Sequence, residues 1–353
     1  MVYIPELETA HVSPDLQLAY IDSFSLLEPA ERPETYTTIL AIHGVGFNST
    51  IFSPMIPHLP PKTRLLAYSQ RSYRGSSSAF ECKEPGGFDA TAAYLEDFLR
   101  FLEWSVRELG VASKQNGGRV VVLSWSKGTV IPISLLALLN SPASSPSASV
   151  APRSFLDAVS PDTIKLAKTL VASHIEALIL FEPPGSAFAR PPTRDFLESM
   201  SSVLPPNEVT REEWALAFAG WVAEYRGPRD ESEEREQLAK SQLGDFERDL
   251  VEKGWEWGCV AHGFQWTLAT EPDEIRRVGE LALRGKEHGV QIGVMYGSRT
   301  VEYFEETVEL IREWWEKDGG ENRAIRSVEG TNHFGFVHKP REFVDALMNC
   351  LKS

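Results

Sequence analysis

Short apolar runs rich in β-branched residues alternate along this chain with stretches of helical spacing. The runs at 37–42 (TTILAI) and 119–123 (RVVVL) are mostly apolar, as in strands buried on both faces of a parallel sheet. Parallel neighbours need long crossover connections, which the helical stretches supply. The pattern predicts an α/β fold with a mostly parallel central sheet flanked by helices. Expected strands cover 16–24, 37–42, 64–68, 119–123, 175–181, 290–296 and 323–328, and expected helices cover 89–109, 127–140, 155–172, 301–317 and 340–351.

The alternation stops between residues 185 and 288. This segment has no convincing strand pattern, reads as amphipathic helices rich in tryptophan, and contains the acidic run 230–236. Strand patterns return at 290–296. The sequence therefore predicts a core in two parts, 1–184 and 289–353, interrupted by a helical insertion at 185–288.

Charge and cysteine content narrow the function classes. The 353 residues include 50 acidic and 35 basic ones, a formal net charge of −15, which argues against nucleic-acid or anionic-membrane partners. Three widely spaced cysteines favour neither a disulfide framework nor a zinc site. The amino terminus does not resemble a signal peptide, and the longest apolar stretch, 130–139, is shorter than the roughly 20 residues that span a bilayer. These features predict a cytoplasmic protein without membrane insertion.

A candidate nucleophile lies between the run 119–123 and the apolar helix expected at 127–140. The segment Ser124-Trp125-Ser126-Lys127-Gly128 places small residues two positions on either side of Ser126. A serine held on a tight strand-to-helix turn needs such small neighbours, and the following helix directs backbone N–H groups at developing negative charge. The spacing centres the turn on Ser126.

The order of these elements resembles the α/β-hydrolase fold family over nearly the whole chain. The resemblance rests on HGVG at 43–46, SWSKG at 124–128 and GTNHF at 330–334, in that order and after expected strands. The family's usual turn begins with glycine, whereas this one begins with Ser124. The resemblance implies that Ser126 is the nucleophile and that 185–288 is a cap domain inserted after the sixth strand.

The same resemblance assigns an oxyanion hole. HGVG follows a buried strand, where the family places one arm of the hole, and glycines allow backbone N–H groups to approach an oxyanion to about 3 Å. The expected donors are the N–H groups of Val45 and Lys127, with Gly46 as an alternative to Val45. Gly44 and Gly46 are expected to border the substrate, and His43 to brace the loop.

His333 is the expected general base among the eight histidines, because it follows the last expected strand within GTNHF. The acid that orients it is less determined by the sequence. Members of the family carry it after the seventh strand, where the first carboxylate here is Glu302, or at the end of the sixth, where this chain has Glu182. Glu182 is the favoured candidate; Glu302, a serine–histidine dyad or another acid are the alternatives.

A serine at 126 indicates acyl chemistry, whereas epoxide hydrolases and haloalkane dehalogenases of this fold use aspartate at that turn. The expected activity is hydrolysis of an ester or lactone of a hydrophobic small molecule, with Trp125, Trp214 and Trp221 in the substrate site. No metal-ligand spacing and no phosphate-binding loop is present, so neither a metal nor another cofactor is expected.

Two other readings use the same residues. The triad could serve acyl transfer, cyclisation, lyase chemistry or C–C bond cleavage, or the fold could be a ligand receptor without turnover. The sequence makes no prediction of oligomeric state.

Overall fold

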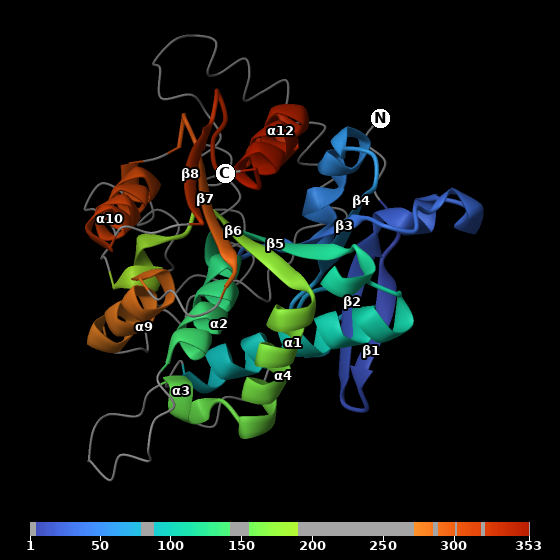
Figure 1. The fold of residues 1–353 in the computed structure, drawn as a ribbon, viewed down its shortest axis with the longest axis horizontal. Helices are drawn as coiled ribbons and strands as arrows, with labels where there is room; N and C mark the ends of the chain where they lie inside the picture. Colours follow the sequence, from blue (N-terminus) through green and yellow to red (C-terminus); the bar gives the residue numbers. More distant parts are fainter. Residues whose placement is uncertain are drawn as a thin grey trace, which may run out of the picture.

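The computed structural model describes residues 5–78, 88–141, 155–189, 272–284, 289–300, 302–318 and 322–352. Eight strands form one sheet in the order β1-β2-β4-β3-β5-β6-β7-β8 (Figure 1). The pairs β1–β2 and β2–β4 are antiparallel, and the other neighbours are parallel. The strands are β1 Glu8–Ser13, β2 Leu16–Asp22, β3 Thr37–Ile42, β4 Thr63–Tyr68, β5 Arg119–Trp125, β6 Ile175–Phe181, β7 Gln291–Gly297 and β8 Arg323–Val328.

Helices cover both faces of this sheet. The helices are α1 Phe88–Glu108, α2 Val130–Asn140, α3 Phe155–Ala158, α4 Pro161–Ser173, α9 Pro272–Arg284, α10 Glu302–Asp318, α11 Gly335–His338 and α12 Pro340–Cys350, with the 3₁₀ segments η1 Ser23–Leu26, η2 Pro29–Glu31, η3 Ser49–His58, η4 Lys114–Asn116, η5 Ser126–Thr129 and η6 Gly185–Phe188. One apolar cluster joins the sheet to α1, α2, α4, α9 and α10, and a second joins its other face to η3, α11 and α12. The predicted α/β fold, with a mostly parallel sheet between helices, is confirmed.

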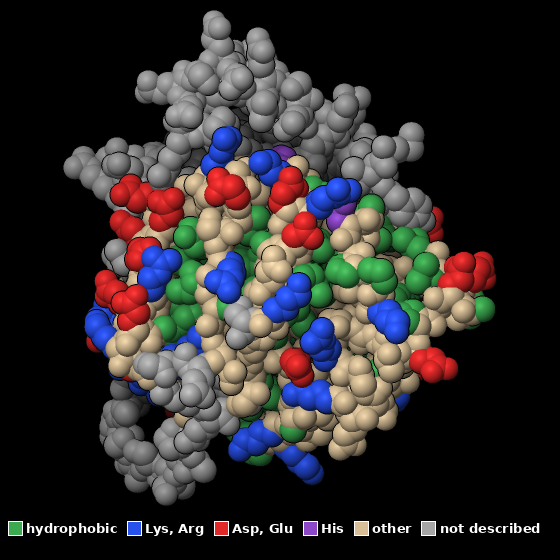
Figure 2. Space-filling model, turned by 45° about the horizontal axis from the view of Figure 1, so that its top comes forward, with side chains coloured by type: hydrophobic (Ala, Val, Ile, Leu, Met, Phe, Trp, Pro, Cys, Tyr) green, Lys and Arg blue, Asp and Glu red, His purple; other side chains and the backbone are tan. Residues whose placement is uncertain are grey.

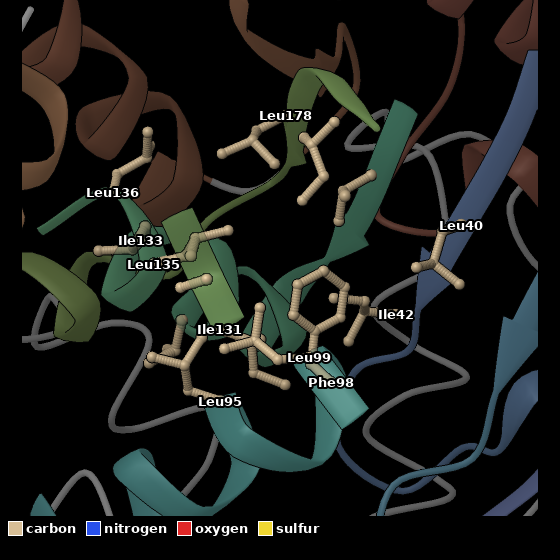
Figure 3. Close-up of a cluster of buried hydrophobic side chains, with 14 of the residues drawn as sticks. Leu40, Ile42, Leu95, Phe98, Leu99, Ile131, Ile133, Leu135, Leu136 and Leu178 are labelled. Atoms are coloured by element: carbon tan, nitrogen blue, oxygen red, sulfur yellow. The ribbon is translucent and has the colours of Figure 1, made fainter. Parts of the chain in front are cut away.

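Strand residues alternate between the two clusters, as a pleated sheet requires. Leu40 and Ile42 of β3 and Leu178 of β6 face α1 and α2, where Phe98 and Leu135 pack against them (Figure 3). The intervening β3 residues face η3 and α12 instead. Burial on both faces explains why β3 reads as an apolar run.

Three local features depart from the sequence expectation. Strand β1 was not expected, because it lies at the sheet edge and Ala10 is its one buried residue. The helix expected at 155–172 is divided into α3 and α4, and the Ser160 hydroxyl caps α4 by accepting from Thr163 N–H at 3.1 Å. The helix expected at 127–140 begins as η5 before α2.

The carboxyl ends of the parallel strands meet at one edge of the sheet. Ile42 of β3 pairs with Ser124 of β5, and Trp125 of β5 pairs with Phe181 of β6. The residues that follow these strands therefore lie beside one another. Ligands in open α/β sheets bind at such an edge.

The structure describes two parts of the predicted insertion, residues 185–189 and 272–284. Helix α9 packs on the core, since Ala282 and Leu283 are fully buried and Asn140 of α2 donates from Nδ2 to the Leu281 carbonyl at 3.0 Å. Trp315 of α10 donates from Nε1 to the Leu283 carbonyl at 3.0 Å. The stretches 190–271 and 285–288 lie outside the described residues, so the helical cap and its limits at 185 and 288 stay predictions.

Acidic and basic side chains lie among one another on the face of the molecule in Figure 2. Within the described ranges, no helix combines the length and apolar character that crossing a membrane requires.

Candidate active site

Ser126 occupies a strained turn between β5 and α2. Its φ of 53° is in the left-handed region, which typically costs a non-glycine residue about 1–3 kcal/mol. A Cβ added at Gly128 would lie 2.5 Å from the His43 carbonyl oxygen, so only glycine fits there. Ser124 is fully buried, and its hydroxyl donates to the Ile179 carbonyl at 3.1 Å, which explains how serine replaces the usual glycine.

Gly44 brings the loop after β3 directly against this turn. A Cβ at Gly44 would lie 3.0 Å from the Ser126 Cβ and 3.1 Å from the Trp125 ring. Glycine therefore permits the backbone of the HGVG loop to reach the candidate nucleophile, as an oxyanion hole requires.

His43 is a brace of this loop. Its Nδ1 donates to the Gly44 carbonyl at 2.8 Å, and its Nε2 accepts from the Gln70 N–H at 2.9 Å. These partners define the neutral tautomer with the proton on Nδ1. Full burial lowers the pKa of His43 to about 4, so the ring stays neutral near pH 7. Neither nitrogen is left for proton transfer to a substrate.

Val45 and Gly46 are the two candidate oxyanion donors of the HGVG loop, and a hydrogen bond of Gly46 distinguishes them. The Gly46 N–H already donates to the Tyr73 hydroxyl at 3.1 Å, and Gly46 has a φ of 82°. The Val45 N–H is thus the better candidate of the two. The second candidate, Lys127, follows Ser126 in the first turn of η5; burial lowers the pKa of its ammonium group to about 7.

Glu182 and His333 are brought together from the ends of β6 and β8. Nδ1 of His333 lies 2.6 Å from Oε2 of Glu182, and Oε1 of Glu182 accepts the Gly297 N–H at 2.9 Å. Glu182 is fully buried and has a φ of 48°. Glu302, the alternative acid, is exposed at the first position of α10.

Aromatic rings surround the His333 imidazole. Phe304 of α10 stacks on it with centroids 4.7 Å apart and planes 18° apart, and Phe334 meets it edge-on at 5.5 Å. The Trp125 ring lies 5.1 Å from the imidazole but is only 1% exposed and packs against Phe47. The contact of Trp125 with substrate stays a prediction.

Several predicted residues cannot be placed, and others were missed. Trp214 and Trp221 lie outside the described residues. Gln70, Tyr73 and Phe304 were not singled out from the sequence, although Gln70 and Tyr73 follow a parallel strand whose carboxyl end lies at this edge. Across the described ranges, no group of histidine, cysteine and acidic side chains could hold a metal ion.

The sequence matches the model of the alpha/beta hydrolase family over residues 39–346. This chain belongs to that family. No curated protein matches the sequence.

Solved structures with the same fold are named for different activities. An esterase from Exiguobacterium antarcticum is 15% identical, with a TM-score of 0.56 over 98% of this chain and 99% of the other. The haloalkane dehalogenase DatA from Agrobacterium tumefaciens C58 is 13% identical, with a TM-score of 0.56 over 98% and 96%. A hydrolase from Pseudomonas aeruginosa is 18% identical, with a TM-score of 0.54 over 99% of both chains. At these identities the likeness shows the fold, and family membership supports hydrolase activity.

Proposed function

We propose that this α/β hydrolase cleaves an ester or lactone bond of a hydrophobic small molecule through an acyl-enzyme on Ser126. The observation that carries the proposal is the 2.6 Å contact between buried Glu182 and Nδ1 of His333. A carboxylate held there fixes the imidazole tautomer with its proton on Nδ1. Nε2 is then the nitrogen that acts as general base toward Ser126.

The chemistry follows from these groups. His333 Nε2 removes the Ser126 hydroxyl proton as Oγ attacks the carbonyl carbon, and the imidazolium that forms is stabilised by Glu182. The Val45 and Lys127 N–H groups donate to the oxyanion. The proton passes to the leaving alcohol oxygen as its bond to carbon breaks. Water, deprotonated by His333, then releases the acid and restores the serine.

The identity of the nucleophile favours this reaction over dehalogenation. Haloalkane dehalogenases of this fold carry aspartate where this chain has Ser126, so an alkyl-enzyme ester on a carboxylate is unavailable here. Acyl transfer, cyclisation, lyase or C–C cleavage chemistry would use the same Ser126 and His333. A receptor without turnover is the remaining alternative. The small-molecule substrate, its contacts with Trp125, Trp214 and Trp221, and a cytoplasmic location belong to the proposal.

Labelling with a fluorophosphonate tests the nucleophile, because the probe reacts covalently with an activated serine. Wild-type protein should be labelled and should hydrolyse aryl esters or lactones, whereas Ser126→Ala should lose both, with turnover reduced roughly 10³-fold or more. Ser124→Ala is the matched control, since it removes a hydroxyl two residues away that donates to the Ile179 carbonyl. An unlabelled wild type, or an active Ser126→Ala variant, would contradict the proposal.

A further inference from the structure

The loop that follows β4 contacts the HGVG loop through hydrogen bonds. Residues 69–77 are called the β4 loop here. Gln70 holds His43 twice: its side-chain Nε2 donates to the His43 carbonyl at 2.7 Å, and its backbone N–H donates to the His43 ring at 2.9 Å. Gln70 therefore fixes the backbone at the start of the HGVG loop through its side chain, and the imidazole of His43 through its own backbone N–H.

Tyr73 holds the other end of the HGVG loop. Its hydroxyl accepts the Gly46 N–H at 3.1 Å, and its ring lies against the His43 ring in an edge-to-face contact with centroids 4.4 Å apart. Tyr73 is 6% exposed, so these contacts are made in a nearly dry environment. Val45 therefore lies between His43 and Gly46, which are both held by the β4 loop.

The β4 loop is itself anchored to the core. Arg71 makes two hydrogen bonds to Asp97 of α1, at 2.6 and 2.9 Å. The Ser76 and Ser77 hydroxyls each accept an N–H from β2, at 2.9 Å. Because the β4 loop is hydrogen-bonded to α1 and to β2, it can hold the HGVG loop in one position instead of moving with it.

Small displacements of the HGVG loop bear directly on the reacting atoms. Gly44 lies against Ser126, and the His43 carbonyl lies against Gly128, with no room for an added Cβ at Gly128. Catalytic groups must be held within about 0.5 Å of their productive positions. Removing an oxyanion donor lowers turnover about 10²–10³-fold in serine hydrolases.

We propose that Gln70 and Tyr73 are positioning residues that keep the Val45 N–H in the oxyanion hole. Because the Tyr73 hydroxyl accepts the Gly46 N–H, Val45 and not Gly46 supplies the donor of this loop. This inference rests on the proposed function. Neither side chain is required to touch substrate. Their effect is exerted on the transition state, where the oxyanion exists, and not on the ground-state ester.

Tyr73→Phe tests the inference, because it deletes the hydroxyl and keeps the ring on His43. We expect kcat for an aryl ester to fall roughly 10-fold, which is less than the fall caused by removing an oxyanion donor altogether. KM should stay within about two-fold of the wild-type value. A trifluoromethyl ketone adds the second readout: Ser126 Oγ bonds to its carbonyl carbon, His333 takes the serine proton, and the ketone oxygen becomes an oxyanion. Its inhibition constant should rise by the same factor as kcat falls. Gln70→Ala should act in the same direction.

Tyr36→Phe is the matched control. It removes a tyrosine hydroxyl that donates to the Gly110 carbonyl at 2.9 Å, beside the amino end of β3 and away from Ser126. Its kcat and inhibition constant should equal those of wild type. The inference would be overturned if Tyr73→Phe had the wild-type kcat. It would also be overturned if Tyr73→Phe and Tyr36→Phe both changed KM alone and to the same extent. Fluorophosphonate labelling of wild type separates the two proposals: an unlabelled wild type defeats the proposed function, and the inference with it.

Discussion

Two buried carboxylates accept hydrogen bonds from basic side chains at opposite ends of the sheet. Asp22, the last residue of β2, accepts hydrogen bonds from Nε and Nη2 of Arg64 at 2.9 and 2.5 Å, near the amino end of β4. Glu182 accepts a hydrogen bond from Nδ1 of His333 at 2.6 Å, beyond the carboxyl end of β6. The two acids are 5% and 0% exposed. Similar burial thus accompanies two different partners.

The two basic partners differ in their ability to transfer a proton. Arg64 keeps its proton, since hydrogen bonds and the charge of Asp22 raise its pKa against the opposing effect of burial, and its guanidinium lies 5.1 Å from the Phe24 ring centroid. A histidine can take a proton from a nucleophile and return it to a leaving group, which arginine cannot do. Asp22 has an extended backbone with a φ of −134°, whereas Glu182 has a φ of 48°. Backbone strain accompanies the pair for which we propose chemistry, and we expect the Asp22–Arg64 pair to affect stability and not turnover.

The largest expected effect is on turnover. Glu182→Gln keeps the volume of the side chain and its contact with the Gly297 N–H but removes the charge that fixes the His333 tautomer. We expect kcat on one ester substrate to fall roughly 10²–10⁴-fold, with little change in melting temperature. Wild-type kcat in this variant would remove Glu182 from the triad and leave a Ser126–His333 dyad or another acid.

The second effect is on stability. Asp22→Asn leaves the Arg64 charge buried without its carboxylate, and breaking such a pair typically costs about 3–5 kcal/mol. Urea unfolding should show this loss, while kcat per folded molecule stays at the wild-type value. Glu309→Gln is the control, because its ion pair with Arg312 is exposed and should contribute less than about 1 kcal/mol. A stable Asp22→Asn variant with an impaired kcat would show that the Asp22–Arg64 pair acts on turnover and not on stability.

A smaller effect is expected from the ring that stacks on His333. Aromatic pairs contribute about 0.5–1.5 kcal/mol beyond their burial, so Phe304→Leu should lower kcat about 2–10-fold by loosening the imidazole. Phe343→Leu is the control, since Phe343 is equally a core ring but packs on Phe181 and Phe336. Equal kcat values for these two variants would show that the stack on His333 has no catalytic role.

The smallest effect is expected at Glu302. Its side chain is exposed and lies outside the contacts of His333, so Glu302→Gln should change kcat by less than about two-fold. Steady-state kinetics beside the Glu182→Gln variant provide the measurement. A crippled Glu302→Gln enzyme with an active Glu182→Gln enzyme would move the acid to the position after β7.

Much of the fold could be read from local pattern. The strands at 37–42, 175–181 and 323–328 have the expected limits, because continuous or alternating apolar runs depend on burial that the sequence encodes directly. Strand β1 could not be read in this way, since an edge strand buries few side chains. The division of α3 from α4 depends on the cap at Ser160, one hydrogen bond that helical spacing does not reveal.

Sequence alone determined the parts of the candidate site that are made by neighbours in the chain. The small residues around Ser126 follow from one tight turn, in which Ser126 itself has a φ of 53°. Tertiary structure decided the rest. The contact of Glu182 with His333 joins residues 151 positions apart, and the choice of Val45 over Gly46 depends on Tyr73, 27 positions beyond Gly46. Backbone conformation is set by short-range sterics that a motif records, whereas side-chain partners are set by strand order and register, which bring distant residues to one edge of the sheet.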